Sequence, residues 1–435
     1  MKRPFDRTIS FIRDFSRSEV LDVVRRERLL SRSELCEAVS VSRATVSGIV
    51  ADLLAIGLLE EVGVGPSTGG RRPIKLAYRP ASRKAVGIVM FNNRIQAALT
   101  DMEGEPINYL EIPLEGLSPE AMLSTMKSAA QQVIRGVASE ELLGIGVGAP
   151  GIVDFESGII EISIGTPWIE GGIPVKTYLA EALKLPVYVA NRSQVAALGE
   201  NLAGVGRNVS SLIYFVLDQG IVAGFVIHGS LYLGSGFASG QIGHVSIEPD
   251  GPLCRCGNRG CLQLYASEEA ILARARAVAR EAVSSLLWQE TDGRVERLTT
   301  DMVFEAARRG DASALAVMNE AGTKVGFAIA TLINLFDPEM VVLGGTIGTQ
   351  AGDLLLKPAT REAQMRALPR SFQKTRIVTG TLGTNALAIG AAVLAIKNTP
   401  ISMIFEGRPA TPDDPPAGGG HPEADATPEA ALGVS

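Results

Sequence analysis

The segment LLGIGVGAPGIV (residues 142–153) is an unbroken run of apolar residues and glycines, and with the three segments that follow it decides the fold. Those segments are the helical pattern IPVKTYLAEALK (173–184), the apolar run LPVYVA (185–190) and a second helical pattern, SQVAALGENLAG (193–204). Short apolar runs that alternate with amphipathic helices are typical of layered α/β proteins. The sequence therefore predicts an α/β fold.

The same alternation extends from about residue 84 to residue 398. Further strand patterns occupy residues 84–91, 96–102, 211–218, 224–233 and 340–345, and further helical patterns occupy residues 118–137 and 314–336. The chain has 435 residues, 46% of them hydrophobic and 20% charged, which is ordinary for a soluble protein but too long for one compact core. We therefore expect two or three domains, with two lobes in the α/β body.

The two ends of the chain give information on location and order. No apolar run reaches the roughly 18 residues that span a bilayer, and the N-terminus lacks the apolar centre of a signal peptide. This predicts a cytosolic protein without a membrane partner.

From Gly407 onward the chain holds six prolines and hardly any large apolar residue, so burial cannot offset the entropy of ordering. We expect residues 399–435 to form a disordered tail.

Residues 1–83 differ from the rest of the chain in charge. They carry 15 Lys and Arg against 10 Asp and Glu, a balance of +5, while the remainder carries 26 against 37, a balance of −11. A basic head on an acidic body indicates that only the head meets a polyanion. Helical patterns at 18–28 and 31–39 precede a third helix, in which Ser42 is the expected N-cap and Gly57 the end.

The third helix has the pattern of a DNA-recognition helix. Its apolar positions follow the helical period and leave Ser42, Arg43, Thr45 and Ser47 on the outer face, as in a helix-turn-helix that offers small polar side chains to the major groove. Residues 58–80 then read as two strands around a glycine-rich loop that bears Arg71 and Arg72, which is the pattern of a wing suited to phosphate or minor-groove contact. The alternative is a small helical module that binds a protein partner.

Five segments, in this order, resemble the ROK family of sugar kinases and sugar-responsive repressors. They are GVGAPGIVD (146–154), LPVYVANRSQVAALGE (185–200), the long stretch 229–267, VVLGG (341–345) and LGTNALAIGAAVLA (382–395). The resemblance implies two actin-like lobes with ribonuclease-H-like folds and a sugar cleft between them, and the head resembles that of the repressor branch.

The resulting division of the chain has five parts. They are a winged helix-turn-helix domain (1–83), a first lobe (84–192), a second lobe with the cysteine-rich loop (193–384), a C-terminal helix that returns to the first lobe (385–398) and the tail (399–435).

The stretch GHVSIEPDGPLCRCGNRGC (243–261) holds three of the four cysteines and one of the three histidines. In a reducing compartment, clustered cysteines are better explained as metal ligands than as disulfides. His244, Cys254, Cys256 and Cys261 would complete a tetrahedron of one imidazole and three thiolates, which favours Zn²⁺ and leaves no position for an activated water. We therefore expect a structural zinc, with a free thiol cluster or redox centre as the alternative.

The resemblance also shows where a kinase would need residues that this chain lacks. The family places its catalytic Asp directly after the Asn that corresponds to Asn191, but this chain has Arg192 there, and a guanidinium cannot accept a proton. The family's phosphate loop DxGGT appears as VMFNN (89–93), and its second loop, GTGIG, appears as DQGIV (218–222). Compared with the family's kinases, the chain thus lacks the catalytic base, the carboxylate that helps to hold the metal and the glycine-rich loops that bind phosphate. The sequence therefore predicts no catalytic residues and no enzyme activity.

The sugar pocket that the resemblance implies is altered in charge. Its expected ligand-binding residues are Asn191, Arg192, Gln241, His244 and Gln263. Two of these, Gln241 and Gln263, stand where the family has Glu, so together with Arg192 three acidic positions have become one cationic and two neutral ones. Arg192 could fork onto a sugar phosphate or a sugar acid. The alternative is a decayed pocket in which Arg192 pairs with an internal carboxylate.

These observations predict a sugar- or sugar-derivative-responsive transcriptional regulator, with repression favoured by the resemblance. A homodimer or tetramer would bind a palindromic operator in double-stranded DNA, because two-fold proteins read two-fold sites. The competing hypothesis is a sugar kinase with an appended DNA-binding domain.

Overall fold

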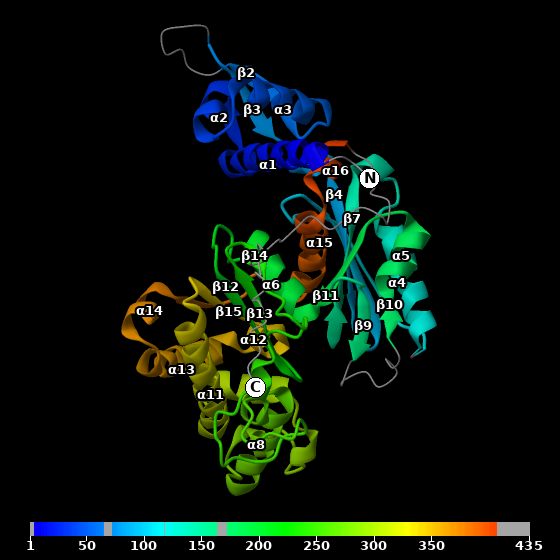
Figure 1. Ribbon diagram of the computed structural model, residues 1–435. Helices are drawn as coiled ribbons and strands as arrows, with labels where there is room; N and C mark the ends of the chain where they lie inside the picture. The colour runs from blue at the N-terminus through cyan, green and yellow to red at the C-terminus, as the bar shows by residue number, and fades with distance from the viewer. Residues whose placement is uncertain (1–3, 65–71, 117, 163–171, 407–435) are drawn as a thin grey trace, which may run out of the picture.

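The structure is a computed structural model that describes residues 4–64, 72–116, 118–162 and 172–406. Figure 1 shows a head at one end of the molecule and two α/β lobes side by side below it, with helix α15 (Ala386–Asn398) between the lobes. The α/β fold with two lobes and a preceding helical head agrees with the sequence prediction.

The head has the winged helix-turn-helix arrangement. Its elements are α1 (Pro4–Glu27), β1 (Leu29–Ser31), α2 (Arg32–Ala38), α3 (Arg43–Ala55), β2 (Leu59–Val64) and β3 (Ile74–Tyr78). The Ser31 side chain and Glu34 form a capping box at the start of α2, and Ser42 caps α3 by accepting from the Thr45 backbone N–H. Gly57, with φ of +73°, follows the end of α3 as expected. The antiparallel sheet β1-β3-β2 supports the wing.

The first lobe is built on a five-stranded mixed sheet. Its strands are β4 (Lys84–Met90), β5 (Arg94–Asp101), β6 (Pro106–Pro113), β7 (Leu142–Ala149) and β11 (Val187–Asn191), in the spatial order β11-β7-β4-β5-β6. Helices α4 (Pro119–Val133) and α5 (Val175–Leu183) cover its outer face, as Figure 1 shows. A small sheet of β8 (Ile152–Asp154), β9 (Ile159–Ile162) and β10 (Ile173–Pro174) extends its lower end.

The second lobe repeats this topology. Its strands are β12 (Leu212–Leu217), β13 (Ile221–Ile227), β14 (Ser230–Leu231), β15 (Met340–Gly344) and β16 (Arg376–Thr379), in the order β14-β13-β12-β15-β16. In both sheets the first strand pairs antiparallel with the second and parallel with the fourth. This shared order is that of two ribonuclease-H-like units. The helices of this lobe are α7 (Gln263–Ala266), α8 (Glu268–Glu281), α9 (Leu286–Gln289), α10 (Thr300–Arg308), α11 (Ala312–Phe336), α12 (Gly345–Gln350), α13 (Gly352–Arg366) and α14 (Pro369–Lys374).

Two helices join the lobes. Helix α6 (Arg192–Leu202) packs on β12 and β13 and also on α15, which in turn packs on β4 and β7 of the first lobe. The approach is close because glycines line it: a Cβ on Gly390 would lie 1.8 Å from the Val195 carbonyl oxygen, and one on Gly87 would lie 1.9 Å from that of Ala388. Helix α15 therefore packs backbone against backbone on both α6 and β4.

The structure corrects the expected tail. Residues 401–406 form helix α16 (Ile401–Glu406) instead of belonging to a disordered segment 399–435. Ile404 and Phe405 lie in the same hydrophobic cluster as the helices of the head, and the Arg17 guanidinium lies 4.6 Å from the Phe405 ring centre. The apolar residues that precede Gly407 supply the burial that the rest of the tail lacks. Residues 407–435 lie outside the described part of the chain.

Polar contacts also connect head and body. The Glu103 carboxylate, in the turn between β5 and β6, pairs with Arg28 and, at 3.2 Å, with Arg25 Nε of α1. Arg83, which is buried, donates from Nε to the Ile404 carbonyl at 3.3 Å and from Nη1 to the Ile56 carbonyl at 3.4 Å. Burial lowers the pKa of Arg83, although nearby carboxylates oppose this. The head is thus fixed to both the body and α16.

The apolar run 142–153 forms two strands, β7 and β8, where the sequence pattern indicates one. The chain turns at Gly151, whose φ is +80°. Among the described residues, no helix has the length and hydropathy needed to cross a membrane.

Candidate functional site

The cysteine-rich loop gathers the four expected metal ligands. The donor atoms of His244, Cys254, Cys256 and Cys261 all lie within 4.8 Å of one another. His244 Nδ1 is 3.8 Å from Cys254 Sγ, and Cys256 Sγ is 3.6 Å from Cys261 Sγ. Three sulfurs and one imidazole around one point fit a tetrahedral Zn²⁺ site, and no disulfide joins any of the chain's cysteines.

The loop backbone and a neighbouring amide prepare this site for a cation. Burial acts against ionisation of Cys254, but the Cys256 backbone N–H and the His244 imidazole hold the pKa of its thiol below the usual value. Gln263 Nε2 donates to Cys254 Sγ at 3.4 Å. Gly260 has a φ of +62° and lies directly against the Glu248 carbonyl, a position that only glycine can occupy. Gln263 therefore supports a metal ligand, a contact that the sequence pattern did not indicate.

Asn191 and Arg192 stand where α6 begins. The Asn191 side chain accepts from the Ser193 backbone N–H at 2.8 Å and donates to the Gly151 carbonyl at 2.5 Å. Gln194 completes a capping box by accepting from the Asn191 backbone N–H. Asn191 thus connects the start of α6 with the turn after β7. The next residue, Arg192, occupies the first position of the helix.

Arg192 is half-buried and lies beside the ring of Phe91, with its guanidinium carbon 5.5 Å from the ring centre. Burial lowers its pKa, and the attraction of Asp218 opposes that shift. The internal ion pair expected of a decayed pocket is not found among the described residues, where Arg192 makes no hydrogen bond or salt bridge. Its charge therefore faces partly buried space without a contacting counterion.

Of the other expected ligand residues, the structure connects Gln241 with the start of α6, whereas Gln263 and His244 contact Cys254. Strand β13 makes the connection to α6, because Ala223 receives a hydrogen bond from Ser193 Oγ at 3.5 Å and donates to the Gly240 carbonyl at 2.7 Å. Gln241 follows directly, is exposed, and accepts at its carbonyl from the His244 backbone N–H. The start of α6 and the segment that leads into the metal loop thus both contact Ala223 of β13.

The lobes also touch near this region, through residues that the sequence pattern did not single out. Phe155 of the first lobe and Phe237 of the second have ring centres 6.5 Å apart. Gln194 Nε2 donates to the Phe237 carbonyl at 3.4 Å. These contacts join the two lobes close to the start of α6.

On the head, the outer face of α3 carries the residues expected to contact DNA. Ser42, Arg43, Thr45 and Ser47 are all exposed, whereas Val46, Ile49 and Val50 of the same helix are buried. Arg43 has no ion pair or hydrogen bond within the described ranges. In the wing, Arg72 is exposed, and Arg71 lies outside the described residues.

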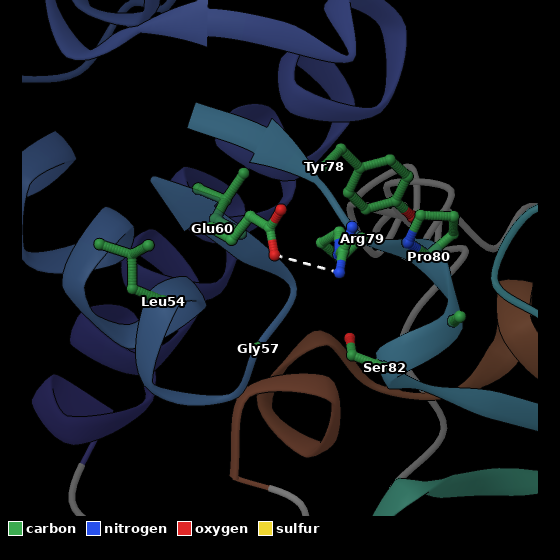
Figure 2. A pocket seen from close by; sticks show the side chains of 9 residues that line it. Leu54, Gly57, Glu60, Tyr78, Arg79, Pro80 and Ser82 are labelled. Atoms are coloured by element: carbon green, nitrogen blue, oxygen red, sulfur yellow. Dashed lines mark ion pairs between the residues drawn. The ribbon is translucent and has the colours of Figure 1, made fainter. Parts of the chain in front are cut away.

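A hollow of about 740 Å³ lies where the wing meets the body, away from the expected sugar cleft. Figure 2 shows it bordered by the end of α3, by β2 and β3, and by the segment that leads into β4. Glu60 and Arg79 form an ion pair of 3.1 Å on its wall. The junction therefore has a hollow between the wing strands and the segment that leads into β4, in addition to the contacts of α16 and Glu103.

Comparisons with known proteins agree with these features. The xylose repressor of Caldicellulosiruptor bescii is 28% identical over 395 residues, which are 89% of this chain and 97% of the repressor. The glucokinase of Halalkalibacterium halodurans is 34% identical over 327 residues, 74% of this chain and 98% of the kinase. A crystal structure of a ROK family transcriptional regulator, a homologue of the Escherichia coli MLC protein, superposes with a TM-score of 0.76 at 25% identity, covering 91% of this chain and 97% of that one.

The share of this chain that each match covers distinguishes the repressor and the regulator from the glucokinase. A match to 89% or 91% of the chain has to include part of the head, whereas a match to 74% can omit it. The profile of the ROK family matches residues 85–398, which is the whole two-lobed body. The chain therefore belongs to the ROK family.

Proposed function

We propose that this protein is a cytoplasmic DNA-binding transcriptional regulator, a repressor of carbohydrate genes, that senses a sugar or sugar derivative without phosphorylating it. The observation that carries the proposal is that one chain combines an exposed helix suited to DNA contact with a kinase-like body whose catalytic base is replaced. Helix α3 offers an exposed polar face, and the position of the catalytic base holds Arg192, which has no lone pair for a proton. The xylose repressor shares both parts of the chain, while the glucokinase match can be confined to the body.

The altered phosphate loops support the same conclusion. Val89, at the position of the family's metal-binding carboxylate, is fully buried in β4, and the bulky Phe91 stands at the position of a glycine that would let backbone amides approach phosphate. Without the base and the cradle, phosphoryl transfer has no catalytic group in the described residues.

The metal loop would hold a structural Zn²⁺ through His244, Cys254, Cys256 and Cys261. A closed four-ligand site supplies folding energy to a loop that has little secondary structure of its own. Its chemical contribution would be to fix Gln241 and His244 beside β13, since both belong to the turn that precedes the loop.

A ligand in the cleft would act on the head through α15 and α16. Closure of the lobes would move α6 and α15 together, and α15 leads directly to α16, which is buried against α1. A ligand changes DNA affinity only if it binds one lobe arrangement more tightly than the other. In a homodimer or tetramer on a palindromic operator, such a movement would change the separation of two heads.

The test is selection of bound duplexes from a random DNA library by the full chain, followed by affinity measurements on the selected site. We expect a palindromic site and a strong decrease in affinity with rising salt. Arg43→Ala should weaken binding about 5- to 150-fold, since a base contact is worth about 1–3 kcal/mol. Arg361→Ala, an exposed arginine on α13 without a described partner, is the matched control.

Two results would contradict the proposal. One is the absence of any enriched sequence, and the other is equal affinity for Arg43→Ala and the unsubstituted chain. A coupled assay for ATP turnover over a panel of hexoses tests the kinase alternative, and turnover would establish it.

A further inference from the structure

A second arginine approaches the same aromatic ring as Arg192. The guanidinium carbon of Arg94, at the start of β5, lies 4.2 Å from the centre of the Phe91 ring, and that of Arg192 lies 5.5 Å from it. The two cations are therefore no farther apart than the sum of these distances. Their repulsion contributes to the lowered pKa of Arg192, after the larger effect of burial.

The two arginines differ in how they are held. Arg94 is oriented by Glu111, 3.2 Å from its Nε, and by the Asn93 side chain, which accepts from Nη1 at 3.1 Å. The Glu111 oxygen that faces Arg94 also accepts from Gln96 at 2.9 Å, so its charge is shared within the sheet. Arg94 is thus held in place at the start of β5 beside Phe91.

Arg192 has no such partner among the described residues. Asp218 attracts it, but the distance exceeds that of an ion pair, and Asp218 Oδ1 accepts from the Gln219 backbone N–H. A partly buried cation without a contacting anion is costly, because it loses hydration and receives no hydrogen-bonded counterion in return. The Phe91 face offsets part of this cost, since the electron-rich face of an aromatic ring attracts a cation. The remaining donors of the guanidinium are available to a ligand.

The surroundings of Arg192 favour an anion that belongs to a sugar derivative and not to a nucleotide. Asp218 is the described carboxylate whose charge acts on Arg192, and Gln241 and Gln263, which the family resemblance assigns to the same pocket, carry no charge that would repel an anion. Phe91 occupies a position where a nucleotide-binding loop needs glycine, so the ring takes the space through which a nucleotide phosphate would reach backbone amides. The planar guanidinium of Arg192 matches the two oxygens of a carboxylate or phosphate.

We propose that the cleft binds a sugar that carries an acidic group, with the carboxylate or phosphate held by Arg192 and assisted by the charge of Arg94. This inference rests on the proposed function, because it names the ligand of the same regulator. Sugar acids and sugar phosphates share the chemistry that the two arginines recognise, and the experiment separates them.

The experiment measures ligand binding to the full chain by thermal shift and then by calorimetry. The probes are hexose and pentose phosphates, uronic and aldonic acids, the neutral parent sugars and inorganic phosphate. We expect at least one acidic sugar to bind 10-fold or more tightly than its neutral parent and than inorganic phosphate. Which class of acid gives the largest shift identifies the source of the anion.

Variants assign the effect to the arginines. Arg192→Gln should weaken the acidic sugar about 10- to 100-fold, the worth of a charge-assisted pair of hydrogen bonds, and leave the neutral parent nearly unchanged. Arg94→Gln should weaken it less, about 3-fold, because that arginine acts through its charge. Arg361→Gln is the matched control and should have no effect.

Several outcomes would overturn the inference. They are stabilisation by neutral sugars alone, no stabilisation by any acidic sugar, binding of inorganic phosphate as tight as that of the sugar acid, or loss of affinity that is equal in Arg192→Gln and Arg361→Gln. Binding of DNA is measured separately on the unsubstituted chain. A chain that binds acidic sugars but no DNA would refute the proposed function and leave this inference standing.

Discussion

The contact between Glu103 and the head gives the sharpest prediction about how the two parts communicate. We expect Glu103→Gln to loosen α1 from the body while leaving both lobes folded. The Glu103 side chain is 8% exposed, and its partners Arg25 and Arg28 are 22% and 45% exposed. Removing one partner of a fully buried pair costs about 3–5 kcal/mol, whereas exposed pairs contribute at most about 1 kcal/mol.

The intermediate exposure of the arginines places the expected cost between these limits, at about 2 kcal/mol, because both guanidinium groups can regain part of their hydration. That cost corresponds to an about 30-fold increase in the opening constant of the contact. Hydrogen exchange of the backbone amides near the end of α1 measures it directly, since exchange there requires local opening. The exchange of β7 and β15 should not change.

The matched control is Glu27→Gln. Glu27 pairs with Arg26 on the same helix, but the two side chains are 49% and 63% exposed, so the expected change is below about 0.5 kcal/mol. The reasoning is refuted if Glu103→Gln and Glu27→Gln give equal exchange rates in α1. It is also refuted if faster exchange is confined to the turn that contains Glu103.

Three further predictions concern the metal, the C-terminal helix and pH. The purified chain should contain one zinc ion, Cys256→Ser should lose it, and Cys36→Ser, outside the loop, should retain it in metal analysis. Phe405→Ala should destabilise the head by about 3 kcal/mol, because it removes a buried ring from the head core, and limited proteolysis should then release the head first. Hydrogen bonds from Lys75 and Ser31 lower the pKa of Glu34 from 4.5 to about 2. Their stabilisation of α2 is therefore complete above about pH 4.5 and is lost as the pH falls toward 2. An NMR titration should follow this loss of stability, and in Glu34→Gln the pH dependence should be absent.

The sequence predicted best what depends on local patterns. The caps and glycine end of α3, the strand and helix alternation, and the metal-ligand cluster each follow from residues close in sequence, where periodicity and turn chemistry act directly. The apolar run 142–153 was harder, because hydrophobicity alone does not reveal the bend at Gly151 that divides it into two strands.

Contacts between distant segments could not be predicted in this way. Nothing in the pattern around Glu103 indicates that its partners lie 75 and 78 residues earlier, and the apolar residues of α16 give no sign of which surface they cover. Nothing in the sequence distinguishes Arg94 from a solvated arginine at the start of a strand. Its distance to Phe91, together with that of Arg192, is what relates it to the expected ligand site.

A helix that transmits movement has to be rigid and has to contact both parts directly, and α15 meets both conditions. It is buried along almost its whole length, and glycines let it approach α6 and β4 at backbone distance, so neither neighbour can slide without moving it. The side-chain layer that usually absorbs small displacements is missing at these contacts. Arg192 is the first residue of α6, and α16 follows α15 after a short turn. A displacement at the start of α6 therefore has a path to α1 made of three helices, with no flexible link longer than that turn. Because Glu103 joins the body directly to Arg25 of α1, that contact would determine whether the head follows the body.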